Sequence, residues 1–274
     1  MAALVRWLAA LLLMLGAAQA QPQRILSLNL CTDQLLVDLA GPEQILGLSP
    51  FARDASRSWA SEKVARLPAL SGTAEEAIAL RPDLVVSSQY MKRETRALIA
   101  ARGIKVVAFE DPATLAAARA QILKFGRLIG AEHRAEARVA ELDAAIAELR
   151  LASAAAPRRV LPFARRGWVA GRETLMADIL REAGLINIAG EMGLTIGGFA
   201  RLEAVVVLKP DLLLLTREPD RAEDQGQALL LHPALARMFP PEKRIVLRES
   251  LTVCGGPALA EALRKLAALL RNRA

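Results

Sequence analysis

Histidine and cysteine, the side chains most used in metal and catalytic sites, are scarce in this chain. Its 274 residues include two histidines, His133 and His232, two cysteines and ten aromatic residues. Zinc and manganese sites need several imidazoles and carboxylates close together, and these two histidines are not expected to converge. The motifs GxSxG, GxGxxG, HExxH and the Walker loop do not occur either. The sequence thus predicts no bare-metal site and no enzyme of these classes.

Long apolar runs are also lacking after the N-terminus. Residues 1–20 contain a single cation, Arg6, then an apolar stretch from Trp7 to Leu15 and the small-residue end 17–20. A secretory signal peptide has this pattern, and the apolar stretch is shorter than the roughly 20 residues that a membrane-spanning helix needs. We expect cleavage before Gln21, which would leave a soluble protein in the periplasm.

Runs of basic residues are missing, although cations exceed anions. The chain has 36 Lys and Arg residues against 29 Asp and Glu residues, a formal net charge of +7. The cations are spread over the sequence, whereas nucleic-acid-binding proteins gather them into a patch. The composition argues against nucleic acid as a partner and is compatible with an anionic small ligand.

A ten-residue phrase that occurs once in each half of the chain is the most informative feature present. The copies are Glu75–Leu84 and Glu203–Leu212; each begins with glutamate and ends with leucine, a basic residue, proline, aspartate and leucine. Each copy predicts a short helix, a turn at the proline and a buried strand, over Leu84–Ser88 and Leu212–Thr216. The repetition indicates two similar lobes, each with one acidic residue at an equivalent position.

Strands and helices alternate on both sides of an alanine-rich segment. Residues 24–111 predict an N-terminal α/β lobe with a mostly parallel sheet, and residues 157–274 repeat that order as a C-terminal α/β lobe. Residues 112–156 join the two, and apolar residues recur there at helical spacing. A glycine interrupts the spacing at Gly130, but we expect one long connecting helix.

The two cysteines each follow a predicted strand, Cys31 the first and Cys254 the last. Thr32 or Asp33 is expected to cap a helix over Gln34–Ala40 directly after Cys31. Loops after the strands of the two lobes would face one another, and an exported protein meets an oxidising compartment. Two interpretations stay open, a disulfide between Cys31 and Cys254 or two buried free thiols.

Taken together, these segments resemble a known family. The first strand runs into Ser27-Leu28-Asn29-Leu30-Cys31-Thr32-Asp33, the Glu…Leu-basic-Pro-Asp-Leu phrase is doubled, and Gly171-Arg172-Glu173-Thr174 opens a helix that ends in Ala183-Gly184-Leu185-Ile186-Asn187. The chain is similar to the metal-chelate class of periplasmic substrate-binding proteins, which serve ABC importers for ferric siderophores, haem and cobalamin. The order of signal peptide, lobe, connecting helix and lobe covers the whole mature chain.

The resemblance implies a fold, a ligand class and a partner. The fold would be two Rossmann-like lobes joined by one long α-helix, with little hinge closure and a ligand cleft between the lobes. Glu75 and Glu203 would dock on arginines of an inner-membrane permease dimer with its ATPase, although Glu76 competes with Glu75 for that role. The protein would be a monomer and a binding protein rather than an enzyme. It would have no cofactor of its own, and any metal would arrive already chelated.

Ligand contacts are expected in the loops that follow the carboxyl ends of the strands, where open α/β sheets bind their ligands. Aromatic side chains in such loops would stack on a flat macrocycle, and arginines would pair with an anionic chelate. Each aromatic also has an interpretation as a core residue. The candidates are Asn29, Cys31, Thr32, Trp59, Tyr90, Arg165, Trp168 and Arg248.

The main alternative is a chelatase-like enzyme on a similar two-lobed fold. Chelatases usually place a histidine in the cleft, and neither histidine here follows a predicted strand. The sequence does not distinguish a ferric siderophore, haem and cobalamin as cargo.

Overall fold

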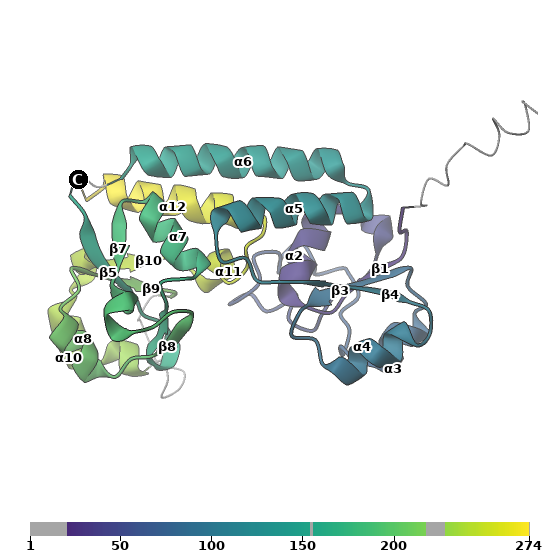
Figure 1. Ribbon diagram of the computed structural model, residues 1–274, viewed down its shortest axis with the longest axis horizontal. Helices are drawn as coiled ribbons and strands as arrows, with labels where there is room; N and C mark the ends of the chain where they lie inside the picture. Colours follow the sequence, from purple (N-terminus) through teal and green to yellow (C-terminus); the bar gives the residue numbers. More distant parts are fainter. Residues whose placement is uncertain (1–20, 154–155, 218–227, 274) are drawn as a thin grey trace, which may run out of the picture.

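The computed structural model describes residues 21–153, 156–217 and 228–273 as two α/β lobes beneath a layer of helices (Figure 1). The predicted signal peptide, residues 1–20, lies outside these ranges. Within them, no helix combines the length and the apolar character that a membrane crossing requires.

The N-terminal lobe is built on a four-stranded parallel sheet in the order β2-β1-β3-β4. The central strands β1 and β3 are buried throughout, which explains why their sequences are apolar runs without alternation. Helices separate the strands along the chain, as parallel pairing requires. The elements are β1 (Ile25–Ser27), α2 (Leu30–Leu39), η1 (Pro42–Gln44), β2 (Ile45–Gly47), α3 (Ala74–Ala79), β3 (Leu84–Ser88), α4 (Arg93–Ala100) and β4 (Lys105–Phe109).

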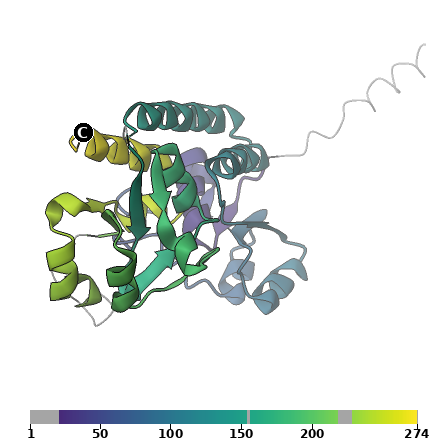
Figure 2. The same ribbon diagram turned by 60° about the vertical axis from the view of Figure 1, so that its left-hand side comes forward.

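The C-terminal lobe has its own four-stranded parallel sheet, in the order β10-β9-β5-β7. A small antiparallel pair, β6 with β8, is added beside it. Figure 2 shows this lobe turned toward the viewer. Its strands are β5 (Arg158–Pro162), β6 (Trp168–Ala170), β7 (Leu185–Asn187), β8 (Gly197–Phe199), β9 (Leu212–Leu215) and β10 (Arg244–Val246). Its α-helices are α7 (Leu175–Glu182), α8 (Leu202–Leu208), α10 (Pro233–Met238), α11 (Glu249–Thr252) and α12 (Leu259–Arg271), and its 3-10 turns are η2 (Arg165–Gly167), η3 (Ile188–Met192), η4 (Leu229–Leu231) and η5 (Pro241–Lys243).

Two helices connect the lobes, where the sequence predicted one. The helix α5 (Leu115–Ile129) ends at Gly130, which adopts a left-handed conformation with φ 73°, and α6 (Glu132–Leu151) begins directly after it. A β-carbon at Gly126 would lie 2.4 Å from that of Ala135, so the two helices pack closely at the turn. The interruption noted at Gly130 is therefore a full chain reversal, and α6 alone spans the two lobes above them (Figure 1).

One hydrophobic core runs through both lobes and the connecting helices. Leu84 of β3, Ile122 of α5, Ile146 of α6, Leu212 of β9 and Leu263 of α12 belong to a single buried cluster. Helix α12 packs along α6 and both lie across the top of the sheets (Figures 1 and 2). Because the lobes share this core, a change in their relative orientation would expose apolar side chains.

The duplicated phrase forms the same turn in both lobes. Arg81 and Lys209, the basic residues before the prolines, both take left-handed backbone conformations, with φ 48° and 46°. The aspartate that follows each proline bonds to the backbone of the neighbouring strand: Asp83 Oδ2 accepts from the Arg24 nitrogen at 3.0 Å, and Asp211 Oδ2 from the Arg159 nitrogen at 2.7 Å. The aspartate therefore locks the strand β3 or β9 to its partner in the sheet.

The arginines Arg24 and Arg159 complete this repeated turn. The Arg24 guanidinium donates to the carbonyl oxygens of Leu80 and Arg81, and that of Arg159 to the corresponding oxygens of Leu208 and Lys209. Carbonyls at a helix C-terminus lack partners within the helix, and a cation there satisfies them. These contacts show that the repeat extends to residues outside the ten-residue phrase.

The first helix begins earlier than the sequence predicted. Its cap is Asn29, whose side chain accepts from the Cys31 nitrogen at 2.8 Å, and the helix starts at Leu30. Thr32 and Asp33 are buried inside the first turn and do not cap it. Asparagine, threonine and aspartate all favour the N-cap position, so residue type alone does not show which of the three caps the helix.

Candidate ligand-binding site

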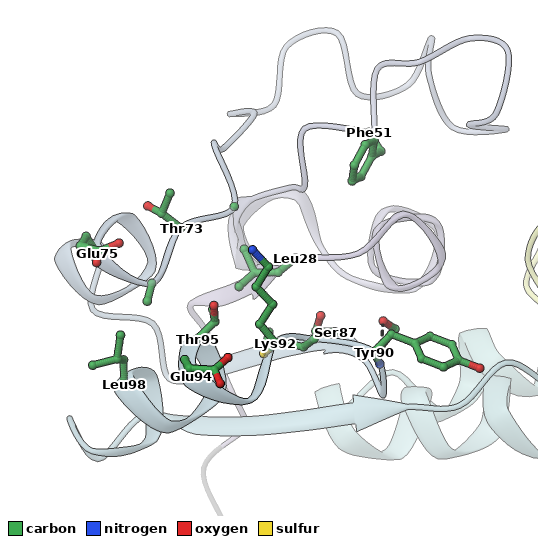
Figure 3. A pocket seen from close by; sticks show the side chains of 14 residues that line it. Leu28, Phe51, Thr73, Glu75, Ser87, Tyr90, Lys92, Glu94, Thr95 and Leu98 are labelled. Carbon is green, nitrogen blue, oxygen red and sulfur yellow. Dashed lines mark hydrogen bonds between the residues drawn. The ribbon is translucent and has the colours of Figure 1, made fainter.

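An open hollow of about 530 Å³ lies in the N-terminal lobe at the carboxyl ends of β1 and β3 (Figure 3). This is the location that parallel sheets favour for ligands. Its lining is mixed, with hydroxyl, apolar and charged side chains, so it suits a ligand with both polar and apolar parts. The lining residues are Leu28, Phe51, Gly72, Thr73, Ala74, Glu75, Ser87, Ser88, Tyr90, Met91, Lys92, Glu94, Thr95 and Leu98.

Two aromatic side chains at the hollow are exposed to solvent. Tyr90, in the loop after β3, is 72% exposed, and Phe51, in the long loop after β2, is 50% exposed. In Figure 3, Tyr90 lies at one end of the hollow, while Glu75 and Leu98 lie at the other and Phe51 above. Exposed rings at the edge of a hollow are available to stack on a ligand.

The C-terminal lobe presents a second aromatic surface on β6 and β8. Trp168 and Phe199 face each other across the strand pair, edge to face with ring centroids 5.2 Å apart, and they are 41% and 68% exposed. Gly197 allows this arrangement, because a β-carbon there would lie 2.6 Å from the Trp168 ring. We call these two rings with the exposed Ile196 the β6–β8 surface.

The hollow and the β6–β8 surface lie on the same side of the molecule. In both ribbon views, α3 and α4 of the N-terminal lobe and β8 of the C-terminal lobe are on the side away from α6 (Figures 1 and 2). Trp168 is placed there by η2, which follows the carboxyl end of β5. Arg165 opens η2 and is exposed, so it belongs to the same region as Trp168.

Three residues that were predicted as ligand contacts form bonds within the protein. Asn29 is the cap of α2. Thr32 is buried, and its hydroxyl lies 2.8 Å from that of Ser27 and 3.0 Å from the Asn29 carbonyl oxygen, so its hydroxyl is bonded within the protein. Cys31 forms a disulfide with Cys254, with the α-carbons 5.2 Å apart. Of the two interpretations of the cysteines, the structure has the disulfide, which joins the two lobes.

Trp59 also lies away from the hollow. Its indole nitrogen donates to Glu261 of α12 at 2.9 Å, and the Lys63 ammonium lies 3.9 Å from its ring centre. Arg248 approaches the same Glu261 carboxylate at 3.8 Å. Arg57 of the long loop pairs with Glu249 at 3.5 Å, so this loop contacts the C-terminal lobe at several points. Trp59 thus contributes to the contacts between the lobes.

The carboxylates of the repeat differ in their surroundings. Glu76 accepts hydrogen bonds from the Ser71 nitrogen and hydroxyl, both at 2.6 Å, and the bond from the Ser71 hydroxyl lowers the pKa of Glu76. Glu75 is exposed on α3, and Glu203 is exposed on the first turn of α8. Because Glu76 is hydrogen-bonded to Ser71, Glu75 is the exposed glutamate of the N-terminal lobe that corresponds to Glu203.

The two histidines are placed as the sequence led us to expect. His133 is on α6, and His232 caps α10, where its Nδ1 accepts from the Ala234 nitrogen at 3.2 Å. Neither lines the hollow. Across the described ranges, no group of three or more His, Cys, Asp and Glu side chains is arranged to hold a metal ion.

Sequence reasoning missed several exposed apolar residues of this side of the molecule. Phe51 lies in a loop without a period, and Ile196 and Phe199 flank two glycines in a segment that looked like an irregular glycine-rich loop. The sequence of that segment did contain an indication of a strand. Glycines between apolar residues, such as Gly197-Gly198, are typical of a strand against which another part of the chain packs closely.

Comparison with known proteins assigns the family. Residues 25–239 match the family described as periplasmic binding protein. The chain belongs to this family. The match covers most of the chain, including the whole N-terminal sheet and every strand of the C-terminal sheet except β10, so it confirms the family resemblance on which the sequence interpretation rested.

Individual relatives agree with this assignment. A curated cobalamin-binding protein of Halobacterium salinarum is 25% identical over 223 residues; the match covers 80% of this chain and 60% of the length of that relative. Among solved structures, the periplasmic haem-binding protein RhuT from Roseiflexus sp. RS-1 is 27% identical, with a TM-score of 0.74 over 92% of this chain and 98% of that one. A periplasmic haem-binding protein from Pseudomonas aeruginosa is 25% identical, with a TM-score of 0.73 over 92% and 94%. These similarities confirm the predicted two-lobed α/β fold class.

Proposed function

We propose that this protein is the substrate-binding component of an ABC importer and that its cargo is a metal chelate, a ferric siderophore, haem or cobalamin. It would capture the chelate in the periplasm and deliver it to an inner-membrane permease dimer with its ATPase. The observation that carries the proposal is the pair of exposed aromatic surfaces, one per lobe, on the same side of a family fold whose relatives are named for binding haem and cobalamin. The protein acts as a monomer and without a cofactor of its own.

The two surfaces suit a large, partly flat ligand. Tyr90 and Phe51 offer rings at the hollow, and Trp168 with Phe199 offers rings on the β6–β8 surface. Macrocycles and catecholate rings gain from stacking on such side chains and from leaving water. Arg165 adds positive charge near Trp168, where it would pair with carboxylates of the chelate.

Tyr90 offers a way to separate the three cargoes. Haem iron takes an axial ligand from the protein, and a tyrosine phenolate is one of the ligands it accepts. Tyr90 is the only tyrosine in the chain, it is well exposed at the hollow, and neither histidine lies there. If haem is the cargo, Tyr90→Phe will change the visible spectrum of the complex. If the cargo is cobalamin or a siderophore whose metal is already fully coordinated, Tyr90→Phe will leave the visible spectrum unchanged.

The alternative is a chelatase-like enzyme. It requires a proton acceptor or metal escort in the site, and the histidines lie elsewhere in the part of the chain that the structure describes. The relatives are binding proteins. We therefore place the function in capture and delivery rather than in catalysis.

Tryptophan fluorescence tests the proposed site directly. After removal of the signal peptide the chain has two tryptophans, Trp59 bonded to Glu261 and Trp168 on the β6–β8 surface. Titration with haemin, cyanocobalamin and a ferric siderophore should quench the emission with one of them. Trp168→Phe should remove most of the quenching, and the control Trp59→Phe should keep it. Loss of quenching in Trp59→Phe alone would place the ligand at the interlobe interface instead.

A further inference from the structure

A second pocket lies at the far end of the C-terminal sheet from the ligand-binding loops. Its volume is about 490 Å³, within the range of small-molecule sites. It forms where strands begin rather than where they end: Arg158 is the first residue of β5, Lys243 immediately precedes β10, and Lys209 and Asp211 precede β9. The preference of ligands for the carboxyl ends of parallel strands, which locates the proposed chelate site, therefore does not explain this pocket.

Three cations converge on this pocket without a matching number of acids. Arg158, Lys209 and Lys243 line it, and among the described residues none of them forms an ion pair. Asp211 is the acidic residue in the lining, and its Oδ2 accepts from the Arg159 backbone nitrogen at 2.7 Å. The carboxylate is thus engaged by the repeated turn, and a net positive charge remains. Pro210, Met238 and Phe239 supply apolar walls.

A fourth cation lies next to these three. Arg273, after the end of α12, donates to the carbonyl oxygens of Glu242 and Arg244 at the start of β10. Burial lowers the pKa of Arg273, and the charge of Arg158 lowers it further. Two guanidinium groups close enough to repel one another are stabilised when an anion binds between or beside them.

The N-terminal lobe provides an internal comparison. Arg24 and Arg159 make the same bonds to the carbonyl oxygens at the ends of α3 and α8. The residue before each differs: it is Gln23 in the N-terminal lobe and Arg158 in the C-terminal lobe. The repeated turn forms with a neutral residue at this position, so the turn does not require the positive charge of Arg158.

We propose that this basic pocket, defined by Arg158, Lys209 and Lys243, binds a small soluble anion that carries a phosphate group. Guanidinium and ammonium groups are the usual partners of phosphate oxygens, the guanidinium through two parallel bonds and the ammonium as a point charge. The apolar wall formed by Met238 and Phe239 accommodates an organic part of the ligand.

The position of the pocket favours a soluble anion over a lipid headgroup. Glu203 is in the first turn of α8, and Lys209 follows the last residue of the same helix, so the two lie at opposite ends of it. If Glu203 docks on the permease, as the proposed function requires, the basic pocket lies at the end of α8 remote from the docking carboxylate. This step rests on the proposed function, whereas the clustering of the cations does not.

Calorimetric titration of the mature protein with inorganic pyrophosphate tests the proposal. We expect one site with a dissociation constant of about 0.1 mM or tighter at low ionic strength. The variant Arg158→Gln with Lys243→Gln should bind about tenfold more weakly or worse, since hydrogen bonds between charged groups are lost. The control Arg102→Gln with Lys105→Gln removes two exposed charges from the N-terminal lobe and should change the affinity less than about twofold.

Three results would overturn the proposal. The first is no binding heat with pyrophosphate at millimolar concentration, and the second is an equal loss in the control variant, which would mean general charge attraction. The third is cosedimentation with phosphatidylglycerol vesicles that depends on Arg158 and Lys243 while pyrophosphate does not bind, which would make a lipid surface the partner. Chelate quenching of Trp168 is measured separately, so failure of this inference is distinguishable from failure of the proposed function.

Discussion

Asp33 is a buried carboxylate in the first turn of α2. It accepts hydrogen bonds from the Ser49 nitrogen at 3.1 Å and from the Ser49 hydroxyl, so it ties α2 to the start of the long loop. Burial raises the pKa of Asp33 to about 6, against the lowering effect of bonds from Ser27 and Ser49. The folded protein therefore holds this proton at pH values where the unfolded chain has lost it.

Asp33→Asn should change how stability depends on pH. Because the pKa of Asp33 is higher in the folded state than its ordinary value of 3.8, its contribution is fully present at low pH and is lost as the pH rises through about 6. Above pH 6, the wild type should have lost on the order of 1–3 kcal/mol of unfolding free energy, and the variant with the neutral amide should not show this loss. Thermal unfolding of both proteins from pH 4 to pH 8 measures this. A stability difference between them that is the same at pH 4 and pH 8 would contradict the assignment.

The predictability of single site residues depended on how many roles each could fill. Tyr90 and Trp168 were predicted as ligand contacts in loops after strands, with a core position as the alternative, and the structure leaves both exposed. Thr32 follows the first strand and Trp59 lies in the long loop, and the structure bonds them to Ser27 and to Glu261. The sequence shows which residues follow a strand, but it does not show which residues of other elements pack against them.

The repeated turn makes a prediction at the scale of elements. Asp83 and Asp211 each accept from backbone nitrogens of the neighbouring strand, and the turn is held in a left-handed conformation at the preceding basic residue. Asp83→Ala and Asp211→Ala should each lower the free energy of unfolding by about 1–3 kcal/mol, because backbone nitrogens of the neighbouring strand lose a charged acceptor. Urea unfolding of the two variants, with Glu62→Ala at an exposed carboxylate as a control, measures the loss.

The disulfide joins an element of each lobe, α2 and the segment after α11. Cys31 and Cys254 are separated by 223 positions in sequence, so the bond closes a very long loop. Replacing both by serine should cost about 2–5 kcal/mol of unfolding free energy, mainly through the unfolded state. Unfolding with and without a reducing agent measures this contribution. The reducing agent should lower the unfolding midpoint of the wild type and leave that of the double variant unchanged. An unchanged wild-type midpoint under reduction would show that the bond does not form in solution.

The regular elements were predictable because buried parallel strands read as apolar runs between turn residues. β3 begins and ends where the sequence predicted, and the prolines of the repeated phrase mark the turns before β3 and β9. The β6–β8 pair was missed because each strand has three residues and β8 begins with two glycines. The reversal at Gly130 was missed because Ala-rich helices on both sides carry the same periodicity.

At the scale of the whole molecule, the lobes are held together by several independent contacts. These are the helix α6, the shared core, the disulfide and the bonds of Glu261 and Glu249 to the long loop. Each would have to break or deform for one lobe to rotate on the other. We therefore expect little hinge closure on ligand binding, and small-angle scattering with and without ligand can measure it.

Docking of this rigid body on a permease would depend on Glu75 and Glu203. Two exposed carboxylates, one per lobe, fix orientation through charge pairs and contribute less to affinity. We expect Glu75→Ala with Glu203→Ala to abolish transport in cells while ligand affinity stays within about twofold. The control Glu62→Ala with Glu136→Ala, which also removes two exposed carboxylates, should transport normally. Weaker ligand binding in the first variant would place Glu75 in the ligand site, since Glu75 also lines the hollow.

The proposed function requires the protein to bind a metal chelate between surfaces of its two lobes. Equilibrium titration of the purified mature chain with haemin, cyanocobalamin and ferric siderophores measures this binding. We expect one bound chelate per chain, with a dissociation constant of about 1 µM or tighter, for at least one of these ligands. Affinity should fall markedly when Tyr90 and Trp168 are both replaced by alanine. Absence of binding to every chelate, or turnover of any of them, would mean that the protein is not a chelate-binding protein.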